Sequence, residues 1–364
     1  MTFPILGGNG AVAGAFSIDN SLRLNDDDTP KLAITPNASN RKTWTFSAWV
    51  KRSSLSSNQR ILSITGTNDF LLRFRGDDKL SFIDGSITSE LITATKVFRD
   101  TSAWYHIVIV LDTTQGTASN RAKLYVNGYQ ETDLVNNSGG SASYPSQNAD
   151  GLINSNVLHT VGCRDISGTV DQNVDGYMAE VHFIDGTAKS PTDFGEFDED
   201  SGIWKPIRYS GSYGTNGFYL DFENSGSLGA DSSGNGNNFT ATNLASTDQT
   251  TDTPTNNFCT LNSIYRNGAS TNIAPTYSEG NTITNSGGSG TSATRTSSTF
   301  EFSSGKWYWE VKVNDSPSAV DIGINNNAIG ALCGIRQDGT YFTDNNNQGT
   351  LTSFTSGDII SFAL

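Results

Sequence analysis

Several features that would point to common protein classes are scarce or missing in this sequence. Basic side chains are few: 23 lysines and arginines stand against 37 aspartates and glutamates, giving a formal net charge of −14. Such a charge disfavours attraction to nucleic-acid phosphates. The longest strongly apolar run, residues 107–111, is far shorter than the roughly 20 residues that cross a bilayer. We therefore expect neither a nucleic-acid partner nor insertion into a membrane.

Residues with catalytic chemistry are equally scarce. The chain has three histidines and three widely spaced cysteines, which predict neither a disulfide framework nor a zinc site. Nucleophile-elbow, P-loop, zinc-protease and Cys-x-x-Cys motifs are absent from the sequence. His106 lies in a segment that is apolar on both faces, which favours a core histidine. These absences predict a protein that is not an enzyme.

The composition and the spacing of apolar residues predict an all-β chain. Glycine (37 residues) is abundant, as are serine, threonine and asparagine, and these residues suit turns between short strands. No segment shows a sustained helical stripe, whereas residues 44–50 alternate, with Trp44, Phe46, Ala48 and Val50 on one face and Thr45, Ser47 and Trp49 on the other. Asn127-Gly128 is a strong hairpin signal. Residues 18–186 read as one sandwich whose core we expect to contain Trp44, Phe46, Trp104, Val108, Val126 and Phe183.

The order of motifs resembles the laminin-G/concanavalin-like lectin superfamily. The resemblance rests on four segments in sequence order: "AWV" at 48–50, "WYHIVIV" at 104–110, "LYVNG" at 124–128 and "DGYMAEV" at 175–181. It implies a jelly-roll sandwich. It also implies the calcium ion that such folds often hold at one rim, with glycan binding as one function and glycoside hydrolysis as another.

The remaining sequence divides into an arm, a connector and a second sandwich. Residues 1–17 form a weakly structured arm that packs on the first domain or docks onto another virion protein. Residues 187–253 form a polar connector with a short laminin-G-like segment, and part of it resembles a linker of marine phage structural proteins. Residues 254–364, with "KWYWEVKV" at 306–313, resemble the SPRY family.

The SPRY-like pattern stops early, which suggests that this second domain is truncated. Its last segment, residues 358–364, reads as a buried strand without a neighbour. We expect either a longer polypeptide or closing strands supplied from elsewhere, because an open apolar edge promotes aggregation.

Acidic clusters in predicted turns are the candidate calcium ligands. They are Asp26, Asp27 and Asp28 near the start of the sandwich, and Asp165, Asp171 and Asp175 near its end. Carboxylates and carbonyl oxygens suit calcium. Solvated turn acids remain the alternative, because no EF-hand spacing is present.

Trp49 and Tyr129 are the candidate sugar-binding residues, because both are predicted on a sandwich face turned away from the core. Aromatic rings there either stack on sugars or are covered by another part of the chain.

These observations favour a structural protein of a bacteriophage particle, such as a tail fibre or appendage, that acts as an adhesive or spacer and contacts host-surface glycans. A positively charged signal sequence is missing before Arg23, which fits a virion location. We expect other virion proteins as partners and a homo-oligomeric assembly. The alternative is a polysaccharide hydrolase or depolymerase. It is disfavoured because Glu180 and Asp185, five residues apart, would lie on opposite faces of a strand.

Overall fold

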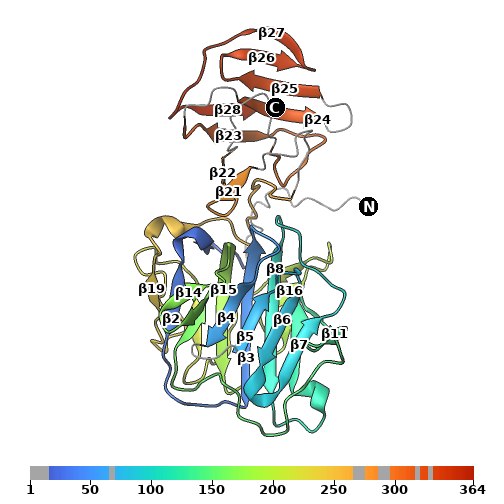
Figure 1. The fold of residues 1–364 in the computed structure, drawn as a ribbon, viewed down its shortest axis with the longest axis vertical. Coiled ribbons are helices and arrows are strands. Elements are labelled where there is room, and N and C mark those ends of the chain that lie inside the picture. Colours follow the sequence, from blue (N-terminus) through green and yellow to red (C-terminus); the bar gives the residue numbers. More distant parts are fainter. Residues whose placement is uncertain (1–15, 65–69, 265–274, 286–295, 316–319, 327–330) are drawn as a thin grey trace. The chain divides into compact units, whose positions relative to one another are not determined.

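A computed structural model describes residues 16–64, 70–264, 275–285, 296–315, 320–326 and 331–364. The chain divides into two compact units, residues 1–300 and 301–364. The first unit contains two layers of antiparallel strands (Figure 1). Within the described ranges, no helix is long and apolar enough to cross a membrane.

The first sheet has the strand order β10-β9-β8-β3-β15-β1-β20, and β18 also pairs with β15. Its strands are β1 Ser21–Leu24, β3 Thr43–Arg52, β8 Trp104–Asp112, β9 Ala122–Val126, β10 Tyr129–Gln130, β15 Gly176–Asp185, β18 Phe218–Leu220 and β20 Gln249–Thr250.

The second sheet has the order β11-β7-β6-β5-β4-β12-β2-β19. Its strands are β2 Lys31–Ile34, β4 Gln59–Ile64, β5 Phe70–Phe74, β6 Leu80–Asp84, β7 Ser89–Thr93, β11 Leu134–Val135, β12 His159–Val161 and β19 Thr240–Thr242.

Short hairpins and single 3-10 turns complete the first unit. The hairpins are β13 Arg164–Ile166 with β14 Thr169–Asp171, β16 Gly195–Phe197 with β17 Trp204–Pro206, and β21 Thr276–Ser278 with β22 Ile283–Asn285. The 3-10 turns are η1 Asp26–Asp28, η2 Gly85–Ile87, η3 Ala118–Asn120, η4 Pro191–Asp193 and η5 Ser246–Asp248.

The two sheets enclose a core of large aromatic and aliphatic side chains. Trp44 is fully buried, and its ring packs edge-on against Phe82 at a centroid distance of 5.8 Å. Phe46, Val126 and Phe183 belong to the same core, as the alternation predicted. The Asn127-Gly128 hairpin is also confirmed: both residues have positive φ, and Tyr129 pairs with Val126.

Two of the predicted core residues are buried elsewhere. Trp104 belongs to a separate cluster on the outer side of the first sheet, together with Trp49 and Trp204. Val108 is buried, but its neighbours Ile107 and Ile109 are the ones in the core between the sheets. The assignment to the inner core was wrong because β8 is apolar on both faces, so alternation could not tell which face is inner.

The central strand β15 carries a bulge that divides its outer edge. Its first part pairs with β1 and its second part with β18, while the register against β3 shifts between Ala179 and His182. Glu180 lies in this bulge with a φ of 49°, in the left-handed region that non-glycine residues seldom adopt.

The boundaries expected at residues 187 and 254 are not boundaries of the structure. β18, β19 and β20, all within the predicted connector, are strands of the two sheets, and the first compact unit extends to residue 300. Residues 187–253 have the polar composition of a linker. Their short strands nevertheless pair with existing sheets, because this pairing requires only a few apolar residues. Most of the predicted N-terminal arm lies outside the described residues.

The second unit contains the pair β23 Tyr308–Lys312 with β28 Ile359–Ala363. It also contains a four-stranded sheet, β24 Asp321–Asn326, β25 Ala331–Arg336, β26 Thr340–Thr343 and β27 Asn346–Thr350. Among its described side chains only two hydrophobic ones, Val313 and Phe354, are buried. The SPRY-like assignment stays a prediction.

Truncation of Trp44 tests the core assignment. We expect Trp44→Ala to lower the free energy of unfolding by about 3–5 kcal/mol, because it removes a fully buried indole that contacts both sheets. Chemical denaturation measures this loss. Tyr129→Ala, at a mostly exposed position, is the control and should change stability little. A Trp44→Ala protein that unfolds at the denaturant concentration of the parent would contradict the assignment.

Candidate functional site

The outer face of the first sheet is covered in its middle by residues 187–220. In this segment the β16–β17 hairpin places Trp204 over the tip of the β9–β10 turn. A side chain at Gly128 would come within 2.4 Å of the Trp204 ring, so only glycine allows this contact. The covering segment therefore packs specifically against the sheet.

His106 is the polar centre beneath this cover. Its ring stacks on Trp49 at a centroid distance of 4.8 Å, and the Trp204 ring lies beside it at 5.8 Å. The Trp204 indole donates to His106 Nδ1 at 3.0 Å, and His106 Nε2 lies 2.8 Å from the Ser47 hydroxyl. Because an indole N–H can only donate, Nδ1 must be an acceptor and the imidazole neutral. Burial, with a contribution from His182, lowers the pKa of His106 to about 3.

This neutral histidine predicts a specific loss of stability in acid. His106 stays neutral in the folded protein, whereas in the unfolded chain it binds a proton below pH 6.5. Relative to His106→Gln, the parent should therefore lose up to about 1.4 kcal/mol of unfolding free energy per pH unit as pH falls below 6.5. Denaturation of both proteins at pH 7.5, 5.5 and 4.5 measures the difference. A difference that does not change with pH would contradict a neutral buried imidazole.

The two predicted sugar-binding aromatics differ in accessibility. Trp49 is only 4% exposed because the covering segment and His106 lie over it, so it presents no ring face to a sugar. Tyr129 is 64% exposed. Its ring lies beside Phe197 with a centroid distance of 4.9 Å, and Phe197 is itself 37% exposed. We call Tyr129 and Phe197 the aromatic pair.

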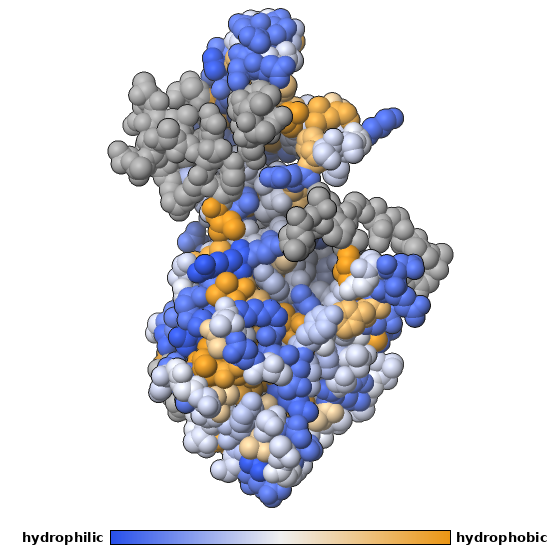
Figure 2. Space-filling model, turned by 90° about the vertical axis from the view of Figure 1, so that its right-hand side faces the viewer, coloured by the Kyte–Doolittle hydropathy of each residue, from blue (hydrophilic) through white to orange (hydrophobic). Residues whose placement is uncertain are grey.

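Charged and polar residues follow or precede the aromatic pair in the sequence. Gln130 follows Tyr129 and is exposed. On the β16–β17 hairpin, Lys205 forms ion pairs with Glu196 at 3.3 Å and with Asp198 at 3.1 Å. On the face drawn in Figure 2, hydrophobic residues of the first unit reach the surface in patches between hydrophilic ones. An exposed ring surface has the composition of a surface that can contact sugars.

A shallow groove of about 310 Å³ lies on the same sheet. Tyr125 and Val110 line it together with polar side chains from the turn after β8, among them Asp112 and Asn120, and with Lys189. Asp112 already accepts from Thr43, Thr114 and Gln115, and these hydrogen bonds keep the pKa of its carboxyl low despite some burial. The groove therefore offers one partly buried ring and several amide and amine groups.

The acid considered for hydrolysis is engaged in a buried cluster. Glu180 is 5% exposed, and Tyr219 donates to its Oε1 at 2.6 Å. His182 lies 3.4 Å from Glu180 Oε2, stacks on Tyr219 at 4.3 Å and contacts the Tyr213 hydroxyl at 3.0 Å. The Asp185 carboxylate also accepts hydrogen bonds, from the Ser39 hydroxyl and the Asn154 amide.

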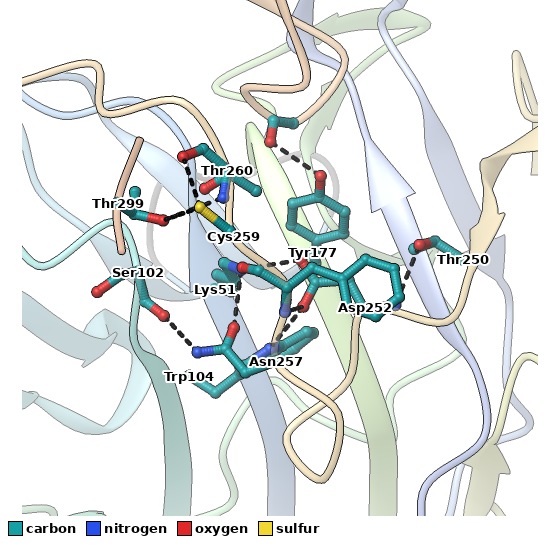
Figure 3. A network of polar contacts seen from close by, with 12 residues as sticks. Lys51, Ser102, Trp104, Tyr177, Thr250, Asp252, Asn257, Cys259, Thr260 and Thr299 are labelled. Carbon is teal, nitrogen blue, oxygen red and sulfur yellow. Dashed lines mark hydrogen bonds and ion pairs between the residues drawn. The ribbon is translucent and has the colours of Figure 1, made fainter. Parts of the chain in front are cut away.

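A buried ion pair fastens residues 250–260 to the first sheet (Figure 3). Lys51 Nζ donates to Asp252 at 2.8 Å, to Asn257 at 2.8 Å and to the Phe258 carbonyl at 3.0 Å. Trp104 donates to the other oxygen of Asp252 at 3.2 Å. Burial lowers the pKa of Lys51, and Asp252 acts in the opposite direction. Sequence reasoning missed this pair, because its members are 201 residues apart and Asp252 lies in an apparently polar linker.

Of the predicted calcium ligands, Asp165 and Asp171 do not fit a metal site. Lys31 forms an ion pair with Asp165 at 2.8 Å, and the Gly168 amide donates to its other oxygen. Arg164 binds Asp171 through two nitrogens, and this contact lowers the pKa of Asp171. Their charges are thus neutralised by basic side chains in and next to the β13–β14 hairpin.

Asp175 fits a cation better. It is 8% exposed, and its Oδ1 has no hydrogen-bond partner. Burial and the charges of Asp26, Asp27 and Glu279 raise its pKa to about 7. Asp28 is tied to the same region, because Asn25 donates to both Asp28 and Glu279. Across the described ranges, however, no three acidic, histidine or cysteine side chains gather in metal-ligating positions.

Calcium at this rim stays a prediction. If it binds, calcium should raise the melting temperature of the parent above that in EDTA, because it offsets the repulsion among these acids. Asp175→Asn should abolish the shift, whereas Asp171→Asn, at an acid already paired with arginine, should keep it. Equal melting temperatures of the parent in calcium and in EDTA would refute the prediction.

Glu279 and Phe197 are the site residues that sequence reasoning missed. Glu279 follows a stretch without strong strand signals, and its contact with Asn25 spans 254 residues. Phe197 could have been found as the apolar residue among the acids of "FGEFDED" at 194–200.

Comparison with known proteins agrees with this fold. Residues 26–193 match the model of the concanavalin A-like lectin/glucanases superfamily. The match lies within the first unit, which therefore contains a laminin-G/concanavalin-like lectin domain. No curated protein matches the chain.

Solved structures with a similar fold include carbohydrate-binding proteins. A putative carbohydrate-binding protein from Bacteroides ovatus is 17% identical over 65% of this chain, with a TM-score of 0.41, and the alignment spans 60% of that protein. The CBM40 of the Ruminococcus gnavus IT-sialidase, bound to α2,3-sialyllactose, is 17% identical over 38% of this chain and 75% of its own, with a TM-score of 0.28. Domains LG4-5 of mouse laminin α1 are 14% identical over 56% of this chain and 48% of theirs, with a TM-score of 0.31.

Proposed function

We propose that this chain is a non-catalytic glycan-binding protein, and that its role is adhesive and structural on the surface of a bacteriophage particle. The first unit binds glycans of the host surface through the outer side of its first sheet. Other virion proteins and further copies of the chain are its partners in the particle.

The observation that carries the glycan proposal is the exposure of the aromatic pair. Most rings of the first unit are buried in its core or under residues 187–220, yet Tyr129 and Phe197 are 64% and 37% exposed and adjacent. Exposed rings that touch each other offer apolar area to the C–H face of a sugar. The laminin-G/concanavalin-like fold supports the same class of ligand.

The non-catalytic part of the proposal is supported by the state of Glu180. A retaining glycosidase needs two carboxyl groups about 5 Å apart beside an open sugar site. Glu180 is instead buried and hydrogen-bonded to Tyr219, and the His182 ring lies 3.4 Å from its other carboxyl oxygen. The surroundings of Glu180 therefore do not support the alternative of a glycoside hydrolase.

The virion role is supported by composition and domain arrangement. A strongly acidic all-β chain with one lectin-like unit and a second β unit suits a spacer that presents a binding surface. Detection of the chain by mass spectrometry in purified particles would test this role separately from glycan binding.

A glycan array followed by titration calorimetry tests the binding site. We expect the chain to bind at least one bacterial surface glycan, and Tyr129→Ala and Phe197→Ala each to weaken binding about tenfold, which corresponds to about 1.4 kcal/mol of lost stacking. Phe258→Ala, at another exposed aromatic position (43%), is the matched control and should bind like the parent.

Two results would count against the proposal. Full affinity in the Tyr129→Ala and Phe197→Ala proteins would exclude the aromatic pair as the binding surface. Release of reducing sugar from the bound glycan, abolished by Glu180→Gln, would favour the hydrolase.

A further inference from the structure

A cluster of arginines lies on the second sheet, whereas Tyr129 of the aromatic pair is on the first. Arg60 on β4 and Arg73 on β5 are directly opposite each other in the antiparallel register. Leu72 and Phe74, which flank Arg73, belong to the core. Because side chains alternate along a strand, Arg73 and its partner Arg60 project to the outer side of this sheet.

Among the described residues, Arg60 and Arg73 have no carboxylate partner. Arg60 donates to the Gln172 side-chain oxygen at 3.1 Å and to the Phe70 carbonyl at 3.4 Å. Arg73 reaches the same Gln172 oxygen at 3.5 Å, and its Nε is buried without any hydrogen-bond partner. Neither arginine forms an ion pair with a described residue. One neutral amide oxygen therefore serves two guanidinium groups.

The charges around this pair do not balance it. Arg164 and Arg75 lie close enough to lower the pKa values of the pair, and the acids that act against them are Asp171 and Asp77. Each of these acids is bound to its own arginine: Asp171 to Arg164, and Asp77 to Arg75 at 3.0 Å. Among the described residues that act on this pair, the positive charges outnumber the negative ones, although the whole chain has a net charge of −14.

A buried cation without a counter-charge is costly. Arg60 is 2% exposed, and burial together with the neighbouring arginines lowers its pKa to about 10. At neutral pH it is nevertheless still charged. No described carboxylate forms an ion pair with this buried charge, and Arg73 on β5 and Arg75 just after it are partly exposed.

We propose that Arg60, Arg73 and their arginine neighbours form a binding site for an anionic substituent, a carboxylate or a sulfate, on an acidic glycan. The planar guanidinium fork suits such oxyanions, and Arg73 is partly exposed. That the anionic group belongs to a glycan rests on the proposed function. The anion site itself rests on the charges and contacts of the cluster.

Calorimetric titration of the full chain with three oligosaccharide probes of equal length tests the site: an oligogalacturonate, a sulfated galactan and a neutral galactan. We expect at least one of the two anionic probes to bind at least tenfold more tightly than the neutral one. Arg73→Met, which keeps most of the side-chain length and removes the charge, should abolish this preference. Arg208→Gln removes one positive charge from an exposed position and should retain it.

Inorganic sulfate separates failure of this site from failure of the proposed function. Sulfate stabilises proteins in general, so the measured quantity is the difference in melting-temperature shift between the parent and Arg73→Met. A larger shift in the parent, without binding of any oligosaccharide, would keep the anion site and reject the glycan as its carrier. Equal shifts in both proteins, together with equal binding of charged and neutral probes, would overturn the inference even if Tyr129→Ala still weakened glycan binding.

Discussion

The structure of the first unit depends on a sheet that is apolar on both faces. In β8 the side chains of Ile107 and Ile109 enter the core between the sheets, while His106 and Val108 are buried on the opposite side. A sheet of this kind must be covered twice. The second sheet covers the inner face, and residues 187–220 cover the outer one. This requirement explains why a segment with the composition of a linker is ordered, and why His106 is held neutral beneath Trp204.

The same cover decides which aromatic surface remains accessible. Trp204 fills the space over Gly128 and His106, and its hairpin neighbour Phe197 packs against Trp204 at 4.8 Å. Phe197 and Tyr129 lie at the border of the cover and keep exposed ring area. The Lys51–Asp252 ion pair extends the cover, because it binds residues 250–260 to the outer side of β3. Removing one member of such a pair leaves an uncompensated buried charge, which typically costs about 3–5 kcal/mol.

Local patterns in the sequence predicted most of the first sandwich, and distant contacts explain what they missed. The alternation at residues 44–50 and the Asn127-Gly128 turn gave the correct strands, since both signals are local. Trp104 and Val108 were placed in the wrong layer because a strand apolar on both faces has no informative period. Trp49 was a reasonable sugar-binding candidate until the segment that covers it was known. The partners Lys51 with Asp252 and Asn25 with Glu279 are separated by more than 200 residues, and no short-range rule relates them.

Charge is distributed unevenly over this acidic protein, so that the region around Asp175 and the outer face of β4 and β5 carry charges of opposite sign. Burial, together with the charges of Asp26, Asp27 and Glu279, favours the neutral form of the Asp175 carboxyl, so the excess charge in this region is negative. Among the described groups on the outer side of β4 and β5 the excess is positive, and the acids that act on the arginine pair are themselves bound to arginines. At an ionic strength of ~0.1 M, charges are screened over about 10 Å. The arginine cluster can therefore attract an anion locally, although the molecule as a whole repels it.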